Sequence, residues 1–334
     1  MNFVGLDIHK KFSYGVIKDE QGKELNRARF DNSEENFDSF LRDFRAEETK
    51  IVMESTGVWE YLYEMLENKG FEVKLANPVR TKAIASARVK TDAIDASTLA
   101  DLLRANLIAE SYVPCKEIRK LRDVVRQRKT LTKGRTQIKN KIHAILIRHG
   151  IKMPYATLCK SAMSWIIDEI KELSIKTVLI SYINLLEQYN TELSFIEGRI
   201  EKIAQADKQA QLLMTIPGIA EIRAMEIVAE IADINRFENS SKLCSYAGLV
   251  PSVRQSGSSL KFGRLIQQSS KSLKNTLIEV SWVAVRTKEA NQLQEFYKKL
   301  CKKKSKQKAI CAVARKMCCI IHAMLRKNQE FMIL

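Results

Sequence analysis

Two short apolar runs near the N-terminus, each ending in a carboxylate, constrain the fold of this chain most strongly. Phe3–Leu6 leads into Asp7. Ile51–Met53 leads into Glu54, and the polar Ser55-Thr56-Gly57 that follows predicts a turn into a helix. Short apolar runs bounded by turn residues are typical of buried β-strands. We therefore expect Asp7 and Glu54 to stand at the ends of two buried strands.

The segment from residue 1 to about 105 alternates strand and helix signals. Strands are predicted at 12–17, 25–30 and 71–75, the last of them stopped by Asn77-Pro78. The polar residues of Asn32–Glu35, ahead of aromatic and aliphatic residues at helical spacing, predict a helix start. The resulting order, β-β-β-α-β-α-β-α, fits a mixed sheet flanked by helices.

Two further carboxylates, Asp92 and Asp95, stand three residues apart in a segment that predicts a helix. At this spacing both side chains project from one helix face. Carboxylates at strand ends and on one helix face can converge on Mg²⁺, which takes oxygen ligands and keeps phosphate in its coordination shell. The predicted metal ligands are therefore Asp7, Glu54, Asp92 and Asp95. The alternative is that these acids only cap strands and open helices.

The length and charge of the chain favour a multidomain protein with a polyanionic partner. Its 334 residues include 56 Lys and Arg against 39 Asp and Glu, a formal net charge of +17, which favours nucleic acid over a membrane. No apolar stretch approaches the roughly 20 residues of a spanning helix, and no signal-peptide pattern is visible. The seven cysteines lack paired CxxC spacing, as is typical of reduced thiols. We expect a cytoplasmic protein without a membrane partner.

From about residue 116 to 205 the chain is predicted to be helical, and its first part is strongly basic. Lys116–Arg148 contains many cations and only two acids, Glu117 and Asp123. Such a density of positive charge suits contacts with phosphates. The predicted nucleic-acid contacts in this stretch are Arg126, Lys129, Lys133, Arg135 and Lys139. The alternative is a basic face that covers an acidic neighbouring domain.

An apolar repeat follows the basic stretch. Its members recur at spacings of four and three, and they are Tyr182, Leu186, Tyr189, Leu193, Ile196, Ile200 and Ile203. This heptad pattern over about three repeats predicts a coiled-coil seam. The partner helix can lie in the same chain or in a second subunit, and the pattern alone does not distinguish the two.

The third region opens near Leu212 with a candidate phosphate-binding turn. Thr215–Ala220, between apolar helical segments, resembles the turn of a helix-hairpin-helix, in which backbone N–H groups face a DNA phosphate. Gly218 is the predicted contact, although Ala220 replaces the second glycine usual in such a hairpin. A simple helix-breaking turn is the alternative.

Two basic segments complete the third region. Gln255–Arg264 is rich in hydroxyls and predicts a flexible segment closed by the cations Lys261 and Arg264. A lysine-rich run between 298 and 308, which includes Lys303, lies among basic helices. We interpret Lys261, Arg264 and Lys303 as nucleic-acid contacts. For the lysine run, a solubilising loop is the alternative.

These landmarks, in this order, resemble the DEDD transposases of bacterial insertion sequences. The resemblance covers nearly the whole chain, in the segments Val4–Asp7, Met53–Gly57, Asn77-Pro78, Lys90–Asp95, Ile216–Ile219 and Ala247–Leu249 through Ser256–Ser259. It implies an N-terminal ribonuclease-H-like (RuvC-like) domain, a mixed sheet with helices, at 1–110. It also implies a helical coiled-coil linker at 111–207 and a mainly helical C-terminal transposase domain at 208–334.

The same resemblance implies roles for individual residues and partners. Ser256 would be the nucleophile, with Ser258 and Ser259 as weaker candidates. Mg²⁺ would be held by the acidic tetrad Asp7, Glu54, Asp92 and Asp95. DNA is the implied substrate, the oligomer is a homodimer or homotetramer, and a structured non-coding bridge RNA is a further partner.

The expected activity is transposition or site-specific recombination, in which Ser256 attacks a DNA phosphodiester and forms a phosphoserine link. One rival is a hydrolytic nuclease or junction resolvase that uses only the N-terminal acids, with metal-activated water. A second rival is a non-catalytic nucleic-acid-binding scaffold whose acids are structural. The histidines show no pairing pattern that would suggest a general base, and they are His9, His143, His149 and His322.

Overall fold

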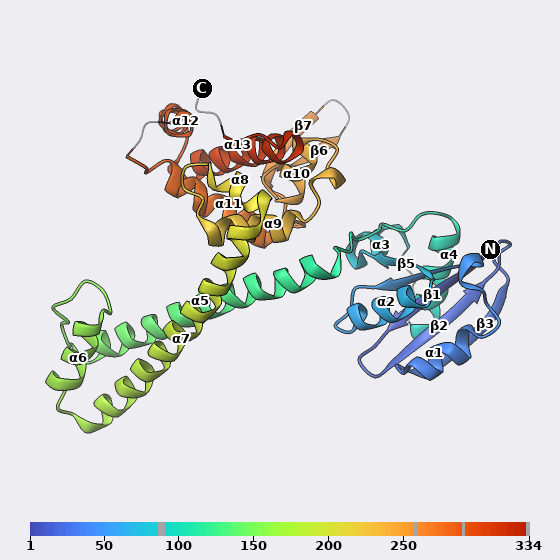
Figure 1. Cartoon of the computed structure of the whole chain (residues 1–334), viewed down its shortest axis with the longest axis horizontal. Helices are drawn as coiled ribbons and strands as arrows, with labels where there is room; N and C mark the ends of the chain where they lie inside the picture. The colour runs from blue at the N-terminus through green and yellow to red at the C-terminus, as the bar shows by residue number, and fades with distance from the viewer. Residues whose placement is uncertain (86–90, 257–258, 289–290, 332–334) are drawn as a thin grey trace. The chain divides into compact units, whose positions relative to one another are not determined.

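The chain folds into two compact units (Figure 1), which we call the N-terminal unit (1–113) and the C-terminal unit (114–334). The structure is a computed structural model that describes residues 1–85, 91–256, 259–288 and 291–331. No helix in these described ranges is both long and apolar enough to cross a membrane.

The N-terminal unit is built on a five-stranded mixed sheet with the order β3-β2-β1-β4-β5. Its strands are β1 (Asn2–Ile8), β2 (Phe12–Lys18), β3 (Glu24–Asp31), β4 (Thr49–Glu54) and β5 (Glu72–Ala76). The strands β1, β2 and β3 pair antiparallel, whereas β4 runs parallel to both β1 and β5. The predicted strands and the mixed sheet are confirmed.

Helices cover both faces of this sheet. They are α1 (Glu34–Leu41), α2 (Trp59–Asn68), α3 (Pro78–Ile84) and α4 (Asp92–Arg104), with a short 3₁₀ turn at Ala46–Glu48. Alternate residues of β1, Val4, Leu6 and Ile8, are buried in one core with the apolar side chains of α1 and α2. On the opposite face, α4 packs its Leu99 and Leu103 against β4 and the end of β5. The period of two along a strand thus assigns each residue of β1 to one face.

The C-terminal unit begins with two long helices, α5 (Lys116–Arg148) and α7 (Leu173–Ala206), with the short α6 (Lys160–Glu169) between them in the chain. The two long helices pack against each other, and a Cβ at Gly134 of α5 would lie 2.6 Å from the Tyr189 ring of α7. Leu186 and Leu193 of the predicted heptad seam are buried. The seam therefore has a partner helix within the same chain.

The remaining helices form one bundle around a shared core. They are α8 (Lys208–Met214), α9 (Glu221–Ile231), α10 (Ser240–Tyr246), α11 (Lys271–Ala284), α12 (Gln292–Cys301) and α13 (Lys306–Lys327), with a 3₁₀ turn at Ile234–Arg236. Val125 of α5 and Ile200 of α7 are buried in this same core. The long helices and the bundle are therefore packed as one body.

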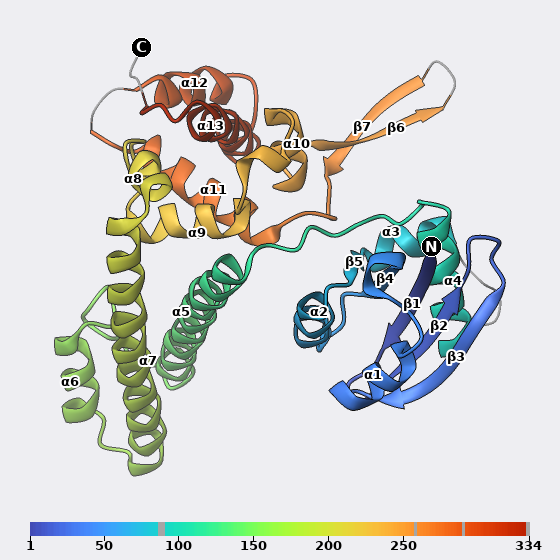
Figure 2. The ribbon, with the colours of Figure 1, turned by 45° about the vertical axis from the view of Figure 1, so that its right-hand side comes forward.

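A β-hairpin projects from the bundle (Figure 2), formed by β6 (Pro251–Ser256) and β7 (Ser259–Leu265). The sequence predicts a flexible segment here, and the structure gives its described residues as two paired strands. The strands pair antiparallel, with Val253 opposite Phe262 and Gln255 opposite Leu260. Val253 and Phe262, each among polar residues, are a strand signal in this hydroxyl-rich sequence.

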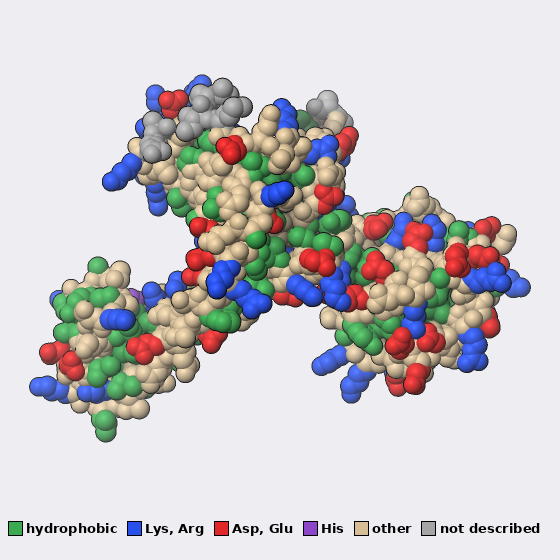
Figure 3. All heavy atoms as spheres, viewed as in Figure 1, with side chains coloured by type: hydrophobic (Ala, Val, Ile, Leu, Met, Phe, Trp, Pro, Cys, Tyr) green, Lys and Arg blue, Asp and Glu red, His purple; other side chains and the backbone are tan. Residues whose placement is uncertain are grey.

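The two units differ in charge. Residues 1–113 contain 16 Lys and Arg against 20 Asp and Glu, a net charge of −4, whereas residues 114–334 contain 40 against 19, a net charge of +21. On the face of the N-terminal unit shown in Figure 3, acids and cations are interspersed. The attraction for a polyanion predicted from the whole chain therefore arises in the C-terminal unit.

Candidate active site

Gly5 allows α4 to lie directly on β1. A Cβ built at Gly5 would come within 2.0 Å of Ala96 O and 2.6 Å of Ala100 N, so any side chain would displace the helix. Asp7 follows Gly5 by two residues and projects from the same face of the strand. The close approach therefore brings the start of α4, which begins at Asp92, toward Asp7.

The structure brings Asp7, His9 and Asp92 together in one cluster. His9 Nε2 lies 3.3 Å from Asp7 Oδ2 and 3.4 Å from Asp92 Oδ2. One ligand atom of each residue lies within 4.8 Å of the other two, and all three residues are partly buried. Two of the four predicted metal ligands are thus adjacent, together with a histidine to which the sequence assigned no role.

Glu54 and Asp95 lie close to this cluster in the fold. Leu6 of β1 pairs with Met53 of the parallel β4, so the residues that follow, Asp7 and Glu54, end neighbouring strands. Asp95 belongs to the first turn of α4, and its charge acts on Asp7. The participation of Glu54 and Asp95 in the site stays a prediction.

The Asp7 carboxyl lies in a crowded acidic environment. Burial raises its pKa above the ordinary value, the charges of Asp92 and Asp95 raise it further, and His9 opposes this effect. Within the described residues, neither Asp7 nor Asp92 makes an ion pair with Lys or Arg. A divalent cation would relieve the repulsion between these carboxylates and would find the oxygen ligands that Mg²⁺ prefers. The residues present therefore fit a metal ion.

Ser256 is the last residue of β6 and pairs with Ser259 of β7. Its side chain lies outside the described part of the structure, as does Ser258. Lys261 and Arg264 lie on β7 and are exposed, as is Ser259. The hairpin thus presents two of the predicted phosphate contacts to solvent, and the role of Ser256 stays a prediction.

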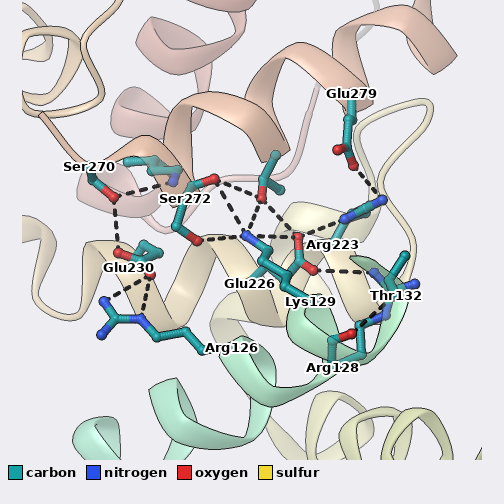
Figure 4. Close-up of polar contacts among 12 residues, drawn as sticks. Arg126, Arg128, Lys129, Thr132, Arg223, Glu226, Glu230, Ser270, Ser272 and Glu279 are labelled. Atoms are coloured by element: carbon teal, nitrogen blue, oxygen red, sulfur yellow. Dashed lines mark hydrogen bonds and ion pairs between the residues drawn. The ribbon is translucent and has the colours of Figure 1, made fainter. Parts of the chain in front are cut away.

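Several cations of the basic helix α5 form ion pairs with acids of the C-terminal unit (Figure 4). Lys129 Nζ lies 2.6 Å from Ser272 Oγ, 2.9 Å from Thr276 Oγ1 and 3.4 Å from the Glu226 carboxylate. Glu226 is fully buried on α9, and it also pairs with Arg128 at 3.5 Å and with Arg223 at 2.8 Å. These contacts give Lys129 partners within its own unit, and its role as a nucleic-acid contact stays a prediction.

A second buried carboxylate, Glu230, lies one turn farther along α9. Arg126 Nη2 lies 3.2 Å from its Oε1, and Ser270 Oγ donates to its Oε2 at 3.0 Å. Burial alone would raise the pKa of Glu230, but the charges of Arg126 and Arg122 outweigh burial and hold the pKa below its ordinary value. Arg126 therefore has a structural partner, although its side chain is half exposed.

The other predicted nucleic-acid contacts are placed differently. Lys133 is exposed on α5, and Arg135 and Lys139 are partly exposed. Lys303, between α12 and α13, is exposed. Gly218 has a φ of +93°, and a Cβ there would lie 2.8 Å from Ala284 N at the end of α11. The turn at Gly218 thus packs against a neighbouring helix, which favours a structural role for this glycine.

Three residues of interest were missed in the sequence, and each had a local signal. His9 follows Asp7 by two residues, a spacing that places both side chains on one side of an extended chain. Glu226 and Glu230 are four residues apart in the otherwise apolar half of α9, which predicts two buried acids that require cations. What the sequence lacked was the identity of their partners.

Comparison with known protein families agrees with this arrangement. A family model for DEDD transposases of IS110 type, described as transposase, matches residues 4–150. A second model, described as transposase of the IS116/IS110/IS902 family, matches residues 210–298. The chain belongs to this transposase family. The first model contains all four predicted tetrad residues, and the second contains the hairpin with Ser256.

Individual relatives resemble the chain over different shares of its length. The transposase for insertion sequence element IS1111A from Coxiella burnetii is 23% identical over 291 residues, 84% of this chain and 79% of the relative. The transposase for IS1328 from Yersinia enterocolitica is 22% identical over 325 residues, 95% of this chain and 94% of the relative. A pilin gene-inverting protein from Moraxella bovis is 32% identical over 128 residues, 38% of this chain and 40% of the relative.

Proposed function

We propose that this protein is a DNA transposase that cuts and rejoins DNA strands through a covalent phosphoserine intermediate. The N-terminal unit would be ribonuclease-H-like and would carry the metal site, and Ser256 would be the nucleophile. The observation that carries the proposal is the convergence of Asp7 and Asp92, without a Lys or Arg partner in the described residues, in a chain of the transposase family.

The chemistry assigned to Ser256 is a reversible transesterification. Its Oγ attacks a DNA phosphorus and loses its proton to a base, while the 3′ oxygen leaves and gains a proton, which yields a phosphoserine and a free 3′-hydroxyl. Attack of another strand's 3′-hydroxyl on the phosphoserine then releases the serine. Each step replaces one phosphate ester by another, so strand exchange needs no external energy source.

Asp7, Glu54, Asp92 and Asp95 are the residues that would hold the metal, Mg²⁺ as the family resemblance implies. When bound, the ion would balance the negative charge that develops on the scissile phosphate. Lys261 and Arg264, exposed on β7, would neutralise the DNA backbone near Ser256. A homodimer or homotetramer and a bridge RNA that selects target and donor DNA complete the proposal.

The test is a search for the covalent intermediate. The protein is incubated with Mg²⁺ and supercoiled plasmid carrying the element ends, and protein–DNA adducts are separated under denaturing conditions. Ser256→Ala should abolish the adduct and strand exchange together. Ser259→Ala removes a weaker candidate that pairs with Ser256 in the same hairpin and is exposed, and this variant should keep both the adduct and strand exchange.

Each outcome has a distinct meaning. An adduct that persists in Ser256→Ala would remove Ser256 from the nucleophile role. Nicked DNA without any attached protein would show that the N-terminal acids catalyse metal-dependent hydrolysis and not strand exchange. DNA binding that is unaffected by chelators and leaves the DNA intact would make the protein a scaffold.

A further inference from the structure

His9 occupies a position that the acidic tetrad does not explain. The face of β1 that carries Gly5 and Asp7 continues to His9, the first residue after the strand, whereas Leu6 and Ile8 are buried on the other face. His9 Nε2 therefore lies beside both Asp7 Oδ2 and Asp92 Oδ2, at 3.3 and 3.4 Å. The imidazole bridges the strand acid and the helix acid.

His9 Nε2 is a buried ring nitrogen close to two carboxylates. The atom is buried, and within the described residues it makes no hydrogen bond, although the ring as a whole is 39% exposed. Two carboxylate oxygens lie within 3.4 Å of this nitrogen. With a divalent ion among the three residues, the lone pair of Nε2 would face the ion beside these oxygens.

The two distances from His9 Nε2 are close to those within a coordination shell. Neighbouring ligands of an octahedral ion with metal–ligand distances of about 2.1 Å lie about 3.0 Å apart. The two contacts of His9 Nε2 exceed that separation by only a few tenths of an ångström. Small side-chain rotations would suffice to bring these atoms around one ion.

The ring of His9 is held in place from several sides. It stacks on Phe12 with ring centroids 4.5 Å apart, and the Arg29 guanidinium covers the Phe12 ring at 3.9 Å. His9 N donates to Phe12 O at 2.9 Å, and Asn32 Nδ2 donates to His9 O at 2.7 Å. The imidazole is thus oriented before any ion binds, as preorganised metal ligands are.

We propose that His9 Nε2 is a ligand of the same divalent ion as Asp7 and Asp92, and that this nitrogen makes the site prefer Mn²⁺ to Mg²⁺. Imidazole suits first-row transition metals, whereas Mg²⁺ takes oxygen ligands almost exclusively. This inference rests on the proposed function only for the presence of a metal at the tetrad. It adds a fifth residue to the site and changes the ion that the site selects.

The test is electron spin echo envelope modulation of Mn²⁺ bound to the full-length protein, which detects a directly coordinated imidazole through its ¹⁴N coupling. The wild-type protein should show this coupling. His9→Phe, which keeps an aromatic ring to stack on Phe12 but removes the nitrogen, should lose it. Mn²⁺ affinity should fall about 10- to 100-fold, the scale seen when partners of a metal site are removed.

Two further variants make the measurement specific. His9→Asn should also lose the coupling, which guards against a steric effect of the phenyl ring. His149→Asn is the matched control, because His149 is an exposed histidine of the C-terminal unit and should leave the spectrum unchanged. In competition, Mg²⁺ should displace Mn²⁺ from the wild type only in large excess, and from His9→Phe at a smaller excess.

The failure of this inference is distinguishable from that of the proposed function. Bound Mn²⁺ without ¹⁴N coupling, or with a coupling that survives in both His9 variants, would exclude His9 as a ligand and leave the transposase chemistry standing. A wild-type protein that binds no Mn²⁺ would also overturn the inference. A normal coupling without strand exchange in either metal would instead overturn the proposed function and leave His9 as a metal ligand.

Discussion

The carboxylate clusters of the two units have different partners. In the C-terminal unit, Glu226 and Glu230 are surrounded by arginines, a lysine and hydroxyl groups. In the N-terminal unit, Asp7 and Asp92 contact His9 and make no ion pair with Lys or Arg in the described residues. Lysine and arginine side chains therefore neutralise Glu226 and Glu230, whereas Asp7 and Asp92 have no such partner in the described residues.

This difference appears in the pKa values. Burial raises the pKa of Asp7 and nearby carboxylates raise it further, whereas arginines hold the pKa of Glu230 below its ordinary value despite burial. An acid that its surroundings have already neutralised has little affinity for a metal ion. The partners of the carboxylates thus distinguish the proposed metal ligands from the neutralised Glu226 and Glu230, which neither burial nor residue type does.

The largest expected effect comes from breaking the structural cluster. Glu226→Ala would leave Arg128, Lys129 and Arg223 close together without their shared buried anion. We expect the C-terminal unit to lose about 3–5 kcal/mol of unfolding free energy, the scale for removing one partner of a buried ion pair. Hydrogen exchange of peptides from α9 and α11 in the full chain measures the loss. A loss below that of an ordinary surface substitution would show that the network is not stabilising.

The second prediction concerns Gly5, which allows α4 to lie close to β1. Gly5→Ala adds a single Cβ that would overlap Ala96 O. We expect a destabilisation of about 1–3 kcal/mol, as for overpacking of a core, and weaker metal binding because Asp92 moves away from Asp7. Gly57→Ala is the matched control, since a Cβ there meets no atom within 4 Å. Metal titrations that are equal for the two variants would refute the positioning role of Gly5.

A third comparison separates structural from nucleic-acid-binding cations on α5. Lys129→Met should destabilise the C-terminal unit by about 1.5–3 kcal/mol, the worth of hydrogen bonds to charged groups, and leave the salt dependence of DNA binding unchanged. Lys133→Met, at an exposed position, should leave stability unchanged. It should reduce the slope of log K against log[salt] by about 0.9, the value for one phosphate contact. The reverse pattern would assign Lys129 to DNA.

The sequence predicted local structure well because local structure depends on local pattern. Asp7 and Glu54 stand at the ends of strands because each follows a short apolar run, and α4 begins at Asp92 because the hydroxyl of Thr91 caps it. The ion pairs of Arg126 and Lys129 could not be predicted from local sequence, because their partner acids lie about a hundred residues away in the chain. A run of cations looks the same whether it faces phosphate or buried glutamates. His9 was missed for a related reason, since its partner Asp92 lies on a distant helix.

The smallest expected effect concerns stability and its dependence on pH at the metal site. The folded-state pKa of Asp7 is raised, so ionisation of this carboxyl disfavours the folded state. The stability that its protonated form contributes is fully present below the unfolded-state pKa of about 3.9 and is lost as pH rises through the higher folded-state pKa. In the absence of metal, Asp7→Asn should therefore be more stable than the wild type at pH 7, and the difference should shrink toward pH 3.

Addition of metal should reverse this order. A divalent ion that binds only the folded wild type stabilises it by about 2.7 kcal/mol at a concentration of 100 times its Kd, whereas Asp7→Asn lacks one ligand and should gain much less. Hydrogen exchange of peptides from β1 and β4, with and without Mg²⁺, measures both changes in the intact chain. The Glu230→Gln variant should behave oppositely, because the pKa of Glu230 is lowered: it should be less stable than the wild type at pH 7, with no response to metal. If Asp7→Asn also lost stability at pH 7 without metal, the two carboxylate clusters would serve the same structural purpose, and the distinction between them would fail.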